Sequence, residues 1–118
     1  MKQNPSRKKN LAKNIFDLSL FSAFKSGSYF INTSRGELVD HDALLRALTQ
    51  GNLSGAAMDV FDDEFNPQFD ITHHALWKYA QSENNLILTP HIGGSTVDAW
   101  EMTENFTITR VLEALKRE

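Results

Sequence analysis

The sequence predicts an α/β fold built on a small, open, parallel sheet of about three strands with flanking helices. Three short segments, residues 29–33, 54–60 and 86–89, consist mostly of apolar or small residues, as expected for strands buried on both faces. Segments with helical spacing separate them, and strands that alternate with helices usually pair in parallel. Three strands make an incomplete sheet for this class, so we expect an exposed strand edge.

Four segments have helical patterns. Residues 11–24 place several apolar side chains three or four positions apart, which predicts a first helix. Asp40 is a suitable N-cap for a second helix that ends at Gly51. Residues 74–79 form a short third helical patch, and a last helix is expected over about residues 96–116.

Composition is typical of a water-soluble chain with one domain. With 118 residues, we expect residues 1–10 to form a polar, disordered tail and residues 11–118 to form one domain. The net charge of -3 gives no electrostatic basis for binding nucleic acid or an anionic membrane. Without cysteine there are no disulfides or thiolate metal sites, and we expect no metal. No segment approaches about 18 apolar residues, so we expect a cytoplasmic protein.

Charged side chains follow each predicted strand. Arg35 comes after the first, Asp59 and Glu64 come at or after the end of the second, and His91 follows the third. Ligands of open parallel sheets bind beyond the carboxyl ends of the strands, so these groups are expected to converge. Each one alone is more typical of a surface, turn or capping residue, and their shared position is what suggests a site.

This set of side chains suits one kind of chemistry. The planar guanidinium of Arg35 could bind a substrate carboxylate at two points. His91 could move a proton to or from a carbonyl or hydroxyl oxygen, and a neighbouring Glu64 would favour its protonated form. The sequence therefore suggests proton transfer on a small carboxylic acid.

Three strings of residues carry a more specific signal. They are residues 30–40 (FINTSRGELVD), residues 42–61, which end in GAAMDVF, and residues 85–96 (NLILTPHIGGST). In order and spacing they resemble three motifs of the D-isomer-specific 2-hydroxyacid dehydrogenases, within the phosphoglycerate-dehydrogenase-like branch. The resemblance covers about residues 25–105. It implies the C-terminal part of a Rossmann-like nucleotide-binding domain.

The resemblance also implies roles for individual residues. Arg35 would bind the carboxylate and carbonyl of a 2-oxo acid, His91 would be the acid–base catalyst, and Glu64 would be its paired carboxylate. Family members often have proline soon after that glutamate, whereas Phe65 follows here and Asp63 is an alternative partner. The expected dinucleotide contacts are Thr33, Ser34, Arg35, Asp59, His91, Gly93 and Gly94.

By the same resemblance, the cofactor would be NAD, with NADP as the open alternative. Hydride from the cofactor and a proton from His91 would together convert a 2-oxo acid into a D-2-hydroxy acid. The substrate partner would thus be a small 2-oxo or 2-hydroxy acid.

The motif that binds the cofactor's phosphates is missing. A full family member has a G-x-G-x-x-G turn that opens a helix, and the six glycines of this sequence form no such pattern. We expect cofactor affinity to fall on the order of a thousandfold. The exposed strand edge and the apolar face expected on the last helix (Trp100, Phe106, Val111 and Leu115 among others) predict a homo-oligomer, a complementing chain or low stability.

Three hypotheses follow for the function of this chain. The first is a truncated dehydrogenase fragment that is inactive or weakly active alone. The second is one half of a split enzyme, which another chain with the glycine-rich unit would complete. The third is a non-enzymatic interaction module that retains the fold and whose binding would not depend on Arg35 or His91.

Overall fold

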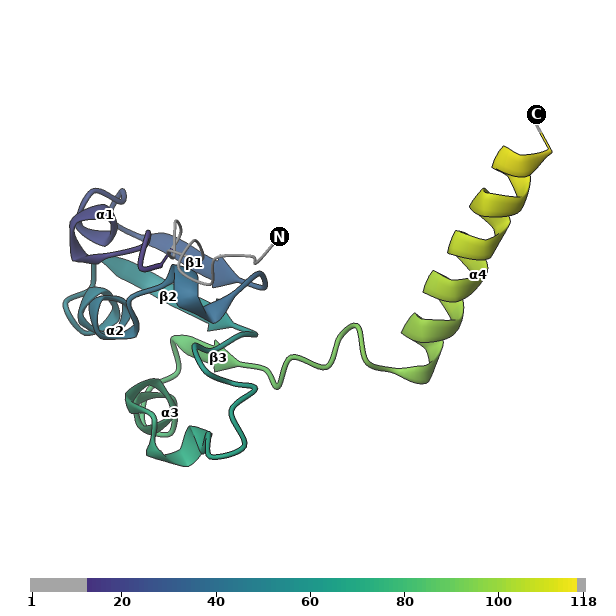
Figure 1. Ribbon diagram of the computed structural model, residues 1–118. Helices are drawn as coiled ribbons and strands as arrows, with labels where there is room; N and C mark the ends of the chain where they lie inside the picture. Colours follow the sequence, from purple (N-terminus) through teal and green to yellow (C-terminus); the bar gives the residue numbers. More distant parts are fainter. Residues whose placement is uncertain (1–12, 117–118) are drawn as a thin grey trace, which may run out of the picture.

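The computed structural model describes residues 13–116 and contains one parallel sheet, with strands in the order β1-β2-β3 (Figure 1). The strands are β1 (Ser28–Asn32), β2 (Leu53–Met58) and β3 (Leu86–Leu88). The α-helices are α1 (Leu18–Ser22), α2 (His41–Thr49), α3 (Ala75–Ala80) and α4 (Val97–Leu115), and two 3-10 turns are Gly36–Leu38 and Ile71–His73. The α/β class and the parallel pairing expected from the sequence are confirmed.

The predicted first helix is largely wrong. Of residues 13–24, only Leu18–Ser22 is helical, capped by the Asp17 side chain, whereas the prediction began at residue 11. Phe16 is extended instead, because its N–H donates to the Leu38 carbonyl and its own carbonyl accepts from Asp40. This tertiary pairing satisfies the backbone that a longer helix would have paired locally. Residues 1–10, expected to be disordered, lie outside the described residues.

The other elements agree with the sequence to within two residues. Asp40 caps α2, with its carboxylate accepting from the Ala43 N–H, and Thr96 caps α4 in the same way. The second strand ends at Met58 rather than at residue 60. Parallel pairing places Asn32 beside Met58 and Met58 beside Leu88, so the three strands end at one edge.

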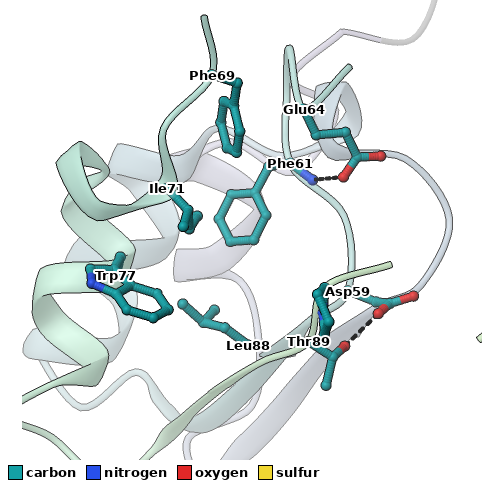
Figure 2. A pocket seen from close by; sticks show the side chains of 9 residues that line it. Asp59, Phe61, Glu64, Phe69, Ile71, Trp77, Leu88 and Thr89 are labelled. Carbon is teal, nitrogen blue, oxygen red and sulfur yellow. Dashed lines mark hydrogen bonds between the residues drawn. The ribbon is translucent and has the colours of Figure 1, made fainter. Parts of the chain in front are cut away.

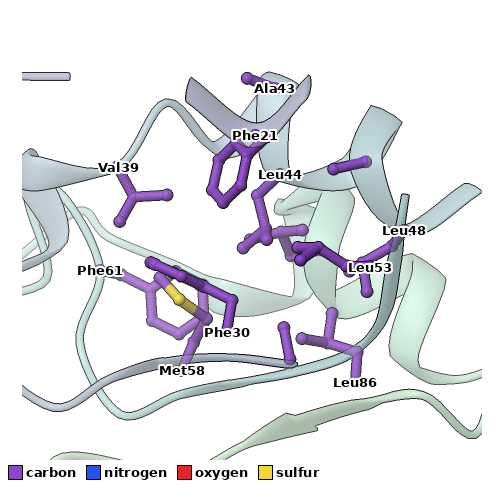
Figure 3. Close-up of a cluster of buried hydrophobic side chains, with 13 residues drawn as sticks. Phe21, Phe30, Val39, Ala43, Leu44, Leu48, Leu53, Met58, Phe61 and Leu86 are labelled. Carbon is purple, nitrogen blue, oxygen red and sulfur yellow. The ribbon is translucent and has the colours of Figure 1, made fainter. Parts of the chain in front are cut away.

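The hydrophobic core lies between the sheet and α1, α2 and α3, which cover one of its faces (Figure 1). Phe21 and Leu44 from the helices are fully buried in one cluster with Phe30 and Met58 from the strands (Figure 3). Leu76 of α3 is also fully buried in this cluster. Burial of apolar surface at about 25 cal/mol per Å² is the main stabilising contribution to such a core. The core therefore holds the three strand ends in register.

The opposite face of the sheet, here called the open face, is exposed. It carries Tyr29, Ile31 and Ile87, with exposed fractions of 73%, 70% and 63%. Strand residues alternate between faces, so these side chains point away from the buried Phe30 and Leu86. The sequence predicted an exposed strand edge, and this exposed apolar face was not predicted.

Helix α4 extends away from the rest of the fold and has no buried residue (Figure 1). Its apolar side chains are exposed, including Trp100 at 61% and Phe106 at 69%. At 3.6 residues per turn these two point about 120° apart. Trp100, Val111 and Leu115 share one side of the helix, and Phe106 lies off it. The predicted apolar face is exposed in the described residues.

Candidate active site at the carboxyl edge of the sheet

The loops that follow the three strands meet at one edge, as expected for parallel strands. Thr33 to Gly36 follow β1, Asp59 follows β2, and Thr89 follows β3. The backbone joins them directly, because the Asp59 N–H donates to the Asn32 carbonyl and the Thr89 N–H donates to the Met58 carbonyl. Residues distant in sequence thus lie side by side before any side-chain contact is considered.

Asn32 organises the loop after β1 and is only 5% exposed. Its side-chain oxygen accepts from the N–H and hydroxyl of Ser34 at 3.0 and 2.9 Å, and its amide donates to the Arg35 carbonyl at 2.9 Å. The buried amide is therefore well satisfied. This role of Asn32 was not predicted, although an asparagine at a strand end before a turn is a signal for it.

Arg35 is exposed at this edge. One guanidinium nitrogen donates to the neighbouring Ser34 carbonyl at 2.6 Å. Arg35 and Glu64 both line a cavity of about 240 Å³, together with Phe61 and Phe65. The structure thus brings the predicted arginine and the predicted glutamate to the same depression.

Gly36 fixes the distance between the loops after β1 and β2. A Cβ atom at this position would lie 2.0 Å from the Phe61 carbonyl carbon and 2.2 Å from the Asp62 nitrogen. Both contacts are to backbone atoms, which cannot rotate aside as a flexible side chain could. Glycine is therefore required by close approach of two main chains.

Asp59 joins the ends of β2 and β3 (Figure 2). Its Oδ1 accepts a short 2.5 Å hydrogen bond from the Thr89 hydroxyl and a 3.1 Å bond from the His91 N–H. One carboxylate oxygen therefore holds the segment that leads to the histidine. His91 itself has a φ of 51°, which turns the chain sharply after Pro90.

His91 and Glu64 form a close pair. The distance from His91 Nδ1 to Glu64 Oε1 is 2.6 Å, and the two side chains are 33% and 13% exposed. The other oxygen, Oε2, accepts from the Phe61 N–H at 2.9 Å (Figure 2). Asp63, the alternative carboxylate, is exposed and has a φ of 59°. Of the two, Glu64 is the residue that contacts the histidine.

This geometry determines which nitrogen of His91 faces outward. An ionised Glu64 can only accept hydrogen bonds, so Nδ1 of His91 is the donor between them. Nε2 is then left for contact with a ligand. Such an arrangement can deliver a proton to an oxygen atom and take it back.

A cavity of about 430 Å³ adjoins the pair and was not predicted from the sequence (Figure 2). Asp59, Glu64 and Thr89 lie on its polar side. Its apolar lining consists of Phe61, Phe69, Ile71, Trp77, Leu88 and Pro90. Phe61, Phe69, Ile71 and Trp77 come from the connection between β2 and β3. Leu88 and Pro90 come from β3 and the residues after it, and no pattern in the sequence indicated that the two groups would face one another.

Gly93 and Gly94 are exposed in the segment between His91 and α4. A Cβ added to either would have no atom within 4 Å, so nothing in the described chain explains a glycine there. Their predicted contact with a dinucleotide stays a prediction. Among residues 13–116, no group of three or more acidic or histidine side chains could hold a metal ion, and no helix is long and apolar enough to cross a membrane.

Comparisons with known proteins agree on one family. A family model described as the NAD-binding domain of D-isomer-specific 2-hydroxyacid dehydrogenases matches residues 6–93. A Staphylococcus aureus (strain USA300) protein that bears the name 2-hydroxyacid dehydrogenase is 38% identical over 104 residues, or 88% of this chain and 30% of that protein. The chain thus spans about 30% of the length of this curated relative.

Solved structures give the same result for the fold. A D-lactate dehydrogenase with NAD⁺ from Lactobacillus jensenii is 31% identical with a TM-score of 0.62, over 72% of this chain and 27% of that one. The NAD-complexed 2-hydroxyacid dehydrogenase of Lactobacillus delbrueckii ssp. bulgaricus has a TM-score of 0.68 at 26% identity, over 98% of this chain and 36% of that one.

Proposed function

Because the chain belongs to the D-isomer-specific 2-hydroxyacid dehydrogenase family, we propose that it carries the acid–base and carboxylate-binding part of an NAD-dependent reduction of 2-oxo acids. The observation that carries the proposal is the His91–Glu64 pair at 2.6 Å, at the strand edge that also presents Arg35. On its own the chain is expected to be inactive or weakly active. The product would be a D-2-hydroxy acid.

His91 is proposed to supply the proton. With Nδ1 donating to Glu64, Nε2 of the protonated ring can donate to the carbonyl oxygen of a 2-oxo acid. The carboxylate of Glu64 accepts from Nδ1 and so orients the ring, and the Phe61 N–H holds that carboxylate in place. Arg35 would bind the substrate carboxylate after its guanidinium leaves the Ser34 carbonyl.

The residues present fit the nicotinamide end of the cofactor. The Asp59 carboxylate accepts both of its hydrogen bonds through Oδ1, which leaves Oδ2 for the carboxamide N–H. Thr33, Ser34, Gly93 and Gly94 are exposed around the same edge and are the other proposed contacts. When bound, NAD or NADP would supply or accept the hydride. The sequence has no G-x-G-x-x-G turn for its pyrophosphate, so affinity should be low.

The direct test is binding of NADH and a 2-oxo acid, followed by backbone NMR on the full chain. We expect millimolar binding that shifts the amide signals of Asp59, Thr89 and His91. Arg35→Ala should weaken 2-oxo acid binding, whereas Arg46→Ala is the matched control, since Arg46 is an exposed arginine on α2. Signals that do not move at saturating NADH, or that move only elsewhere, would refute the proposal.

A second candidate is one half of a split enzyme. Among the described residues, β1 pairs only with β2, so its other edge could accept a strand from a complementing chain or a second copy. NADH binding tighter than about 100 μM, corresponding to roughly 5.5 kcal/mol, would favour this candidate. Such tight binding would mean that a partner chain provides the missing binding site for the phosphates of NADH.

A further inference from the structure

Two histidines meet beneath the candidate active site. His41 is the first residue of α2 and His74 is the N-cap of α3, so 33 positions separate them in sequence. Nδ1 of His41 lies 3.1 Å from Nε2 of His74, and the ring centroids are 4.9 Å apart. We call these two residues the histidine pair.

Hydrogen bonds fix the tautomers of the pair. Nδ1 of His74 accepts from the Leu76 N–H at 3.1 Å, so a neutral His74 carries its proton on Nε2. That proton points to Nδ1 of His41, which must then be the acceptor. His41 therefore carries its own proton on Nε2, which is buried without a hydrogen-bond partner among the described residues.

Neither ring can gain a proton without losing a contact. A proton added to His41 would place two N–H groups head to head across the 3.1 Å gap. A proton added to Nδ1 of His74 would face the Leu76 N–H and remove the cap of α3. The observed geometry therefore belongs to the doubly neutral pair.

Phe61 connects the histidine pair to the candidate acid–base pair. Its ring centroid lies 5.5 Å from that of His41 and 5.2 Å from that of His74, in edge-on contacts. Its backbone N–H is the donor that holds Oε2 of Glu64. A displacement of the Phe61 ring would therefore be transmitted through one residue to the carboxylate that contacts His91.

We propose that the neutral histidine pair is a positioning device, which holds Phe61 and thereby keeps the Glu64 carboxylate against His91. The inference rests on the proposed function for its significance, because it assigns a purpose to the Glu64–His91 contact. It predicts that acidification releases the device and disturbs the acid–base pair. Its test requires neither cofactor nor turnover.

Nearby carboxylates raise the pKa values of the histidine pair, but burial lowers them by more. Asp40, Asp42 and Asp62 favour a charged His41, and Asp62 is itself paired with Lys13 at 2.9 Å. Burial acts more strongly, and with the neighbouring His74 it lowers the pKa of His41 to about 4. Burial also lowers the pKa of His74, against a weaker opposing effect of Asp42. The charged groups that share a surface depression with His74 are Asp63, Asp70 and His73.

The experiment is NMR of the full chain at pH 7.5, reading the Phe61 amide and the ring nitrogens of its four histidines. His74→Asn retains an N-cap oxygen for α3 but removes the ring contact with His41. We expect this variant, and His41→Leu, to shift the Phe61 amide signal and the His91 Nδ1 signal. His73→Asn is the matched control, because His73 is an exposed neighbour of His74, and it should leave both signals unchanged. Unchanged signals in a folded His74→Asn variant would overturn the proposal.

A second measurement, a pH titration, tests the proposal even if the histidine variants do not fold. In a Glu64→Gln chain the carboxylate no longer titrates, yet the side-chain oxygen can still accept from the Phe61 N–H. We expect the Phe61 amide to titrate in this chain with the same midpoint as the ring of His41. A Phe61 signal that stays flat while His41 becomes protonated would refute the inference, whatever the outcome of the NADH experiment.

Discussion

Replacing Gly36 with alanine is the most direct test of how the loops after β1 and β2 are held together. The new Cβ would lie 2.0 Å from the Phe61 carbonyl carbon, whereas ordinary contact begins near 3.4 Å, so the loops must separate by 3.4 − 2.0 = 1.4 Å. The obstruction is backbone, so no rotamer change can relieve it. Overpacking of this kind costs about 1–3 kcal/mol, and we expect the upper end of that range.

Urea denaturation followed by circular dichroism measures this loss of unfolding free energy. Gly93→Ala is the matched control, because a Cβ there would have nothing within 4 Å and should change stability by less than about 0.5 kcal/mol. The same displacement should weaken the Phe61–Glu64 hydrogen bond and shift the His91 ring signals. If Gly36→Ala unfolds at the same urea concentration as Gly93→Ala, the close approach of the two loops is wrong.

Three further predictions follow from the structure. Asn32→Ala removes three hydrogen bonds from a buried turn and should lower the free energy of unfolding by about 1–3 kcal/mol in urea denaturation. Because the folded state lowers the pKa of His41 from 6.5 to about 4, unfolded chains bind protons first as pH falls below 6.5. Stability should then decrease between pH 6.5 and about 4, by roughly 1–2 kcal/mol after solvent screening, and His41→Leu should flatten that dependence. Sedimentation velocity should detect self-association through the open face and α4, and a monodisperse monomer that melts cooperatively would contradict it.

Local signals were sufficient for most of the fold. Asp40 followed by an apolar stripe predicted α2, because an N-cap and a periodic apolar face are both local features of the sequence. The three strands were predictable because each is a short apolar run between turn residues. The prediction of the first helix was wrong because Phe16 makes its backbone hydrogen bonds to residues 38 and 40. A local sequence pattern does not indicate pairing between residues so far apart.

The candidate site also has a part that the sequence predicted and a part that depends on tertiary contacts. Arg35, Glu64 and His91 were found because they follow strand ends, and parallel topology alone predicts that such residues converge. The structure shows that Glu64, rather than the alternative Asp63, contacts His91. The histidine pair and the cavity beside Phe61 were missed because their members come from separate elements and make sense only as tertiary contacts.

The geometry proposed for acid–base chemistry does not depend on a glycine-rich turn for the phosphates of a cofactor. Glu64, Asp59 and His91 are positioned by hydrogen bonds and by the close approach at Gly36, all of which lie within residues 32–91. None of those contacts draws on a glycine-rich turn, so the proton-transfer pair can be formed without one. Low NADH affinity and an intact His91–Glu64 contact are therefore compatible. NADH affinity and the His91–Glu64 contact should be measured in one sample. Weak binding with the contact intact would mean that the site is formed but binds little cofactor, whereas loss of the contact would mean that the site is not formed.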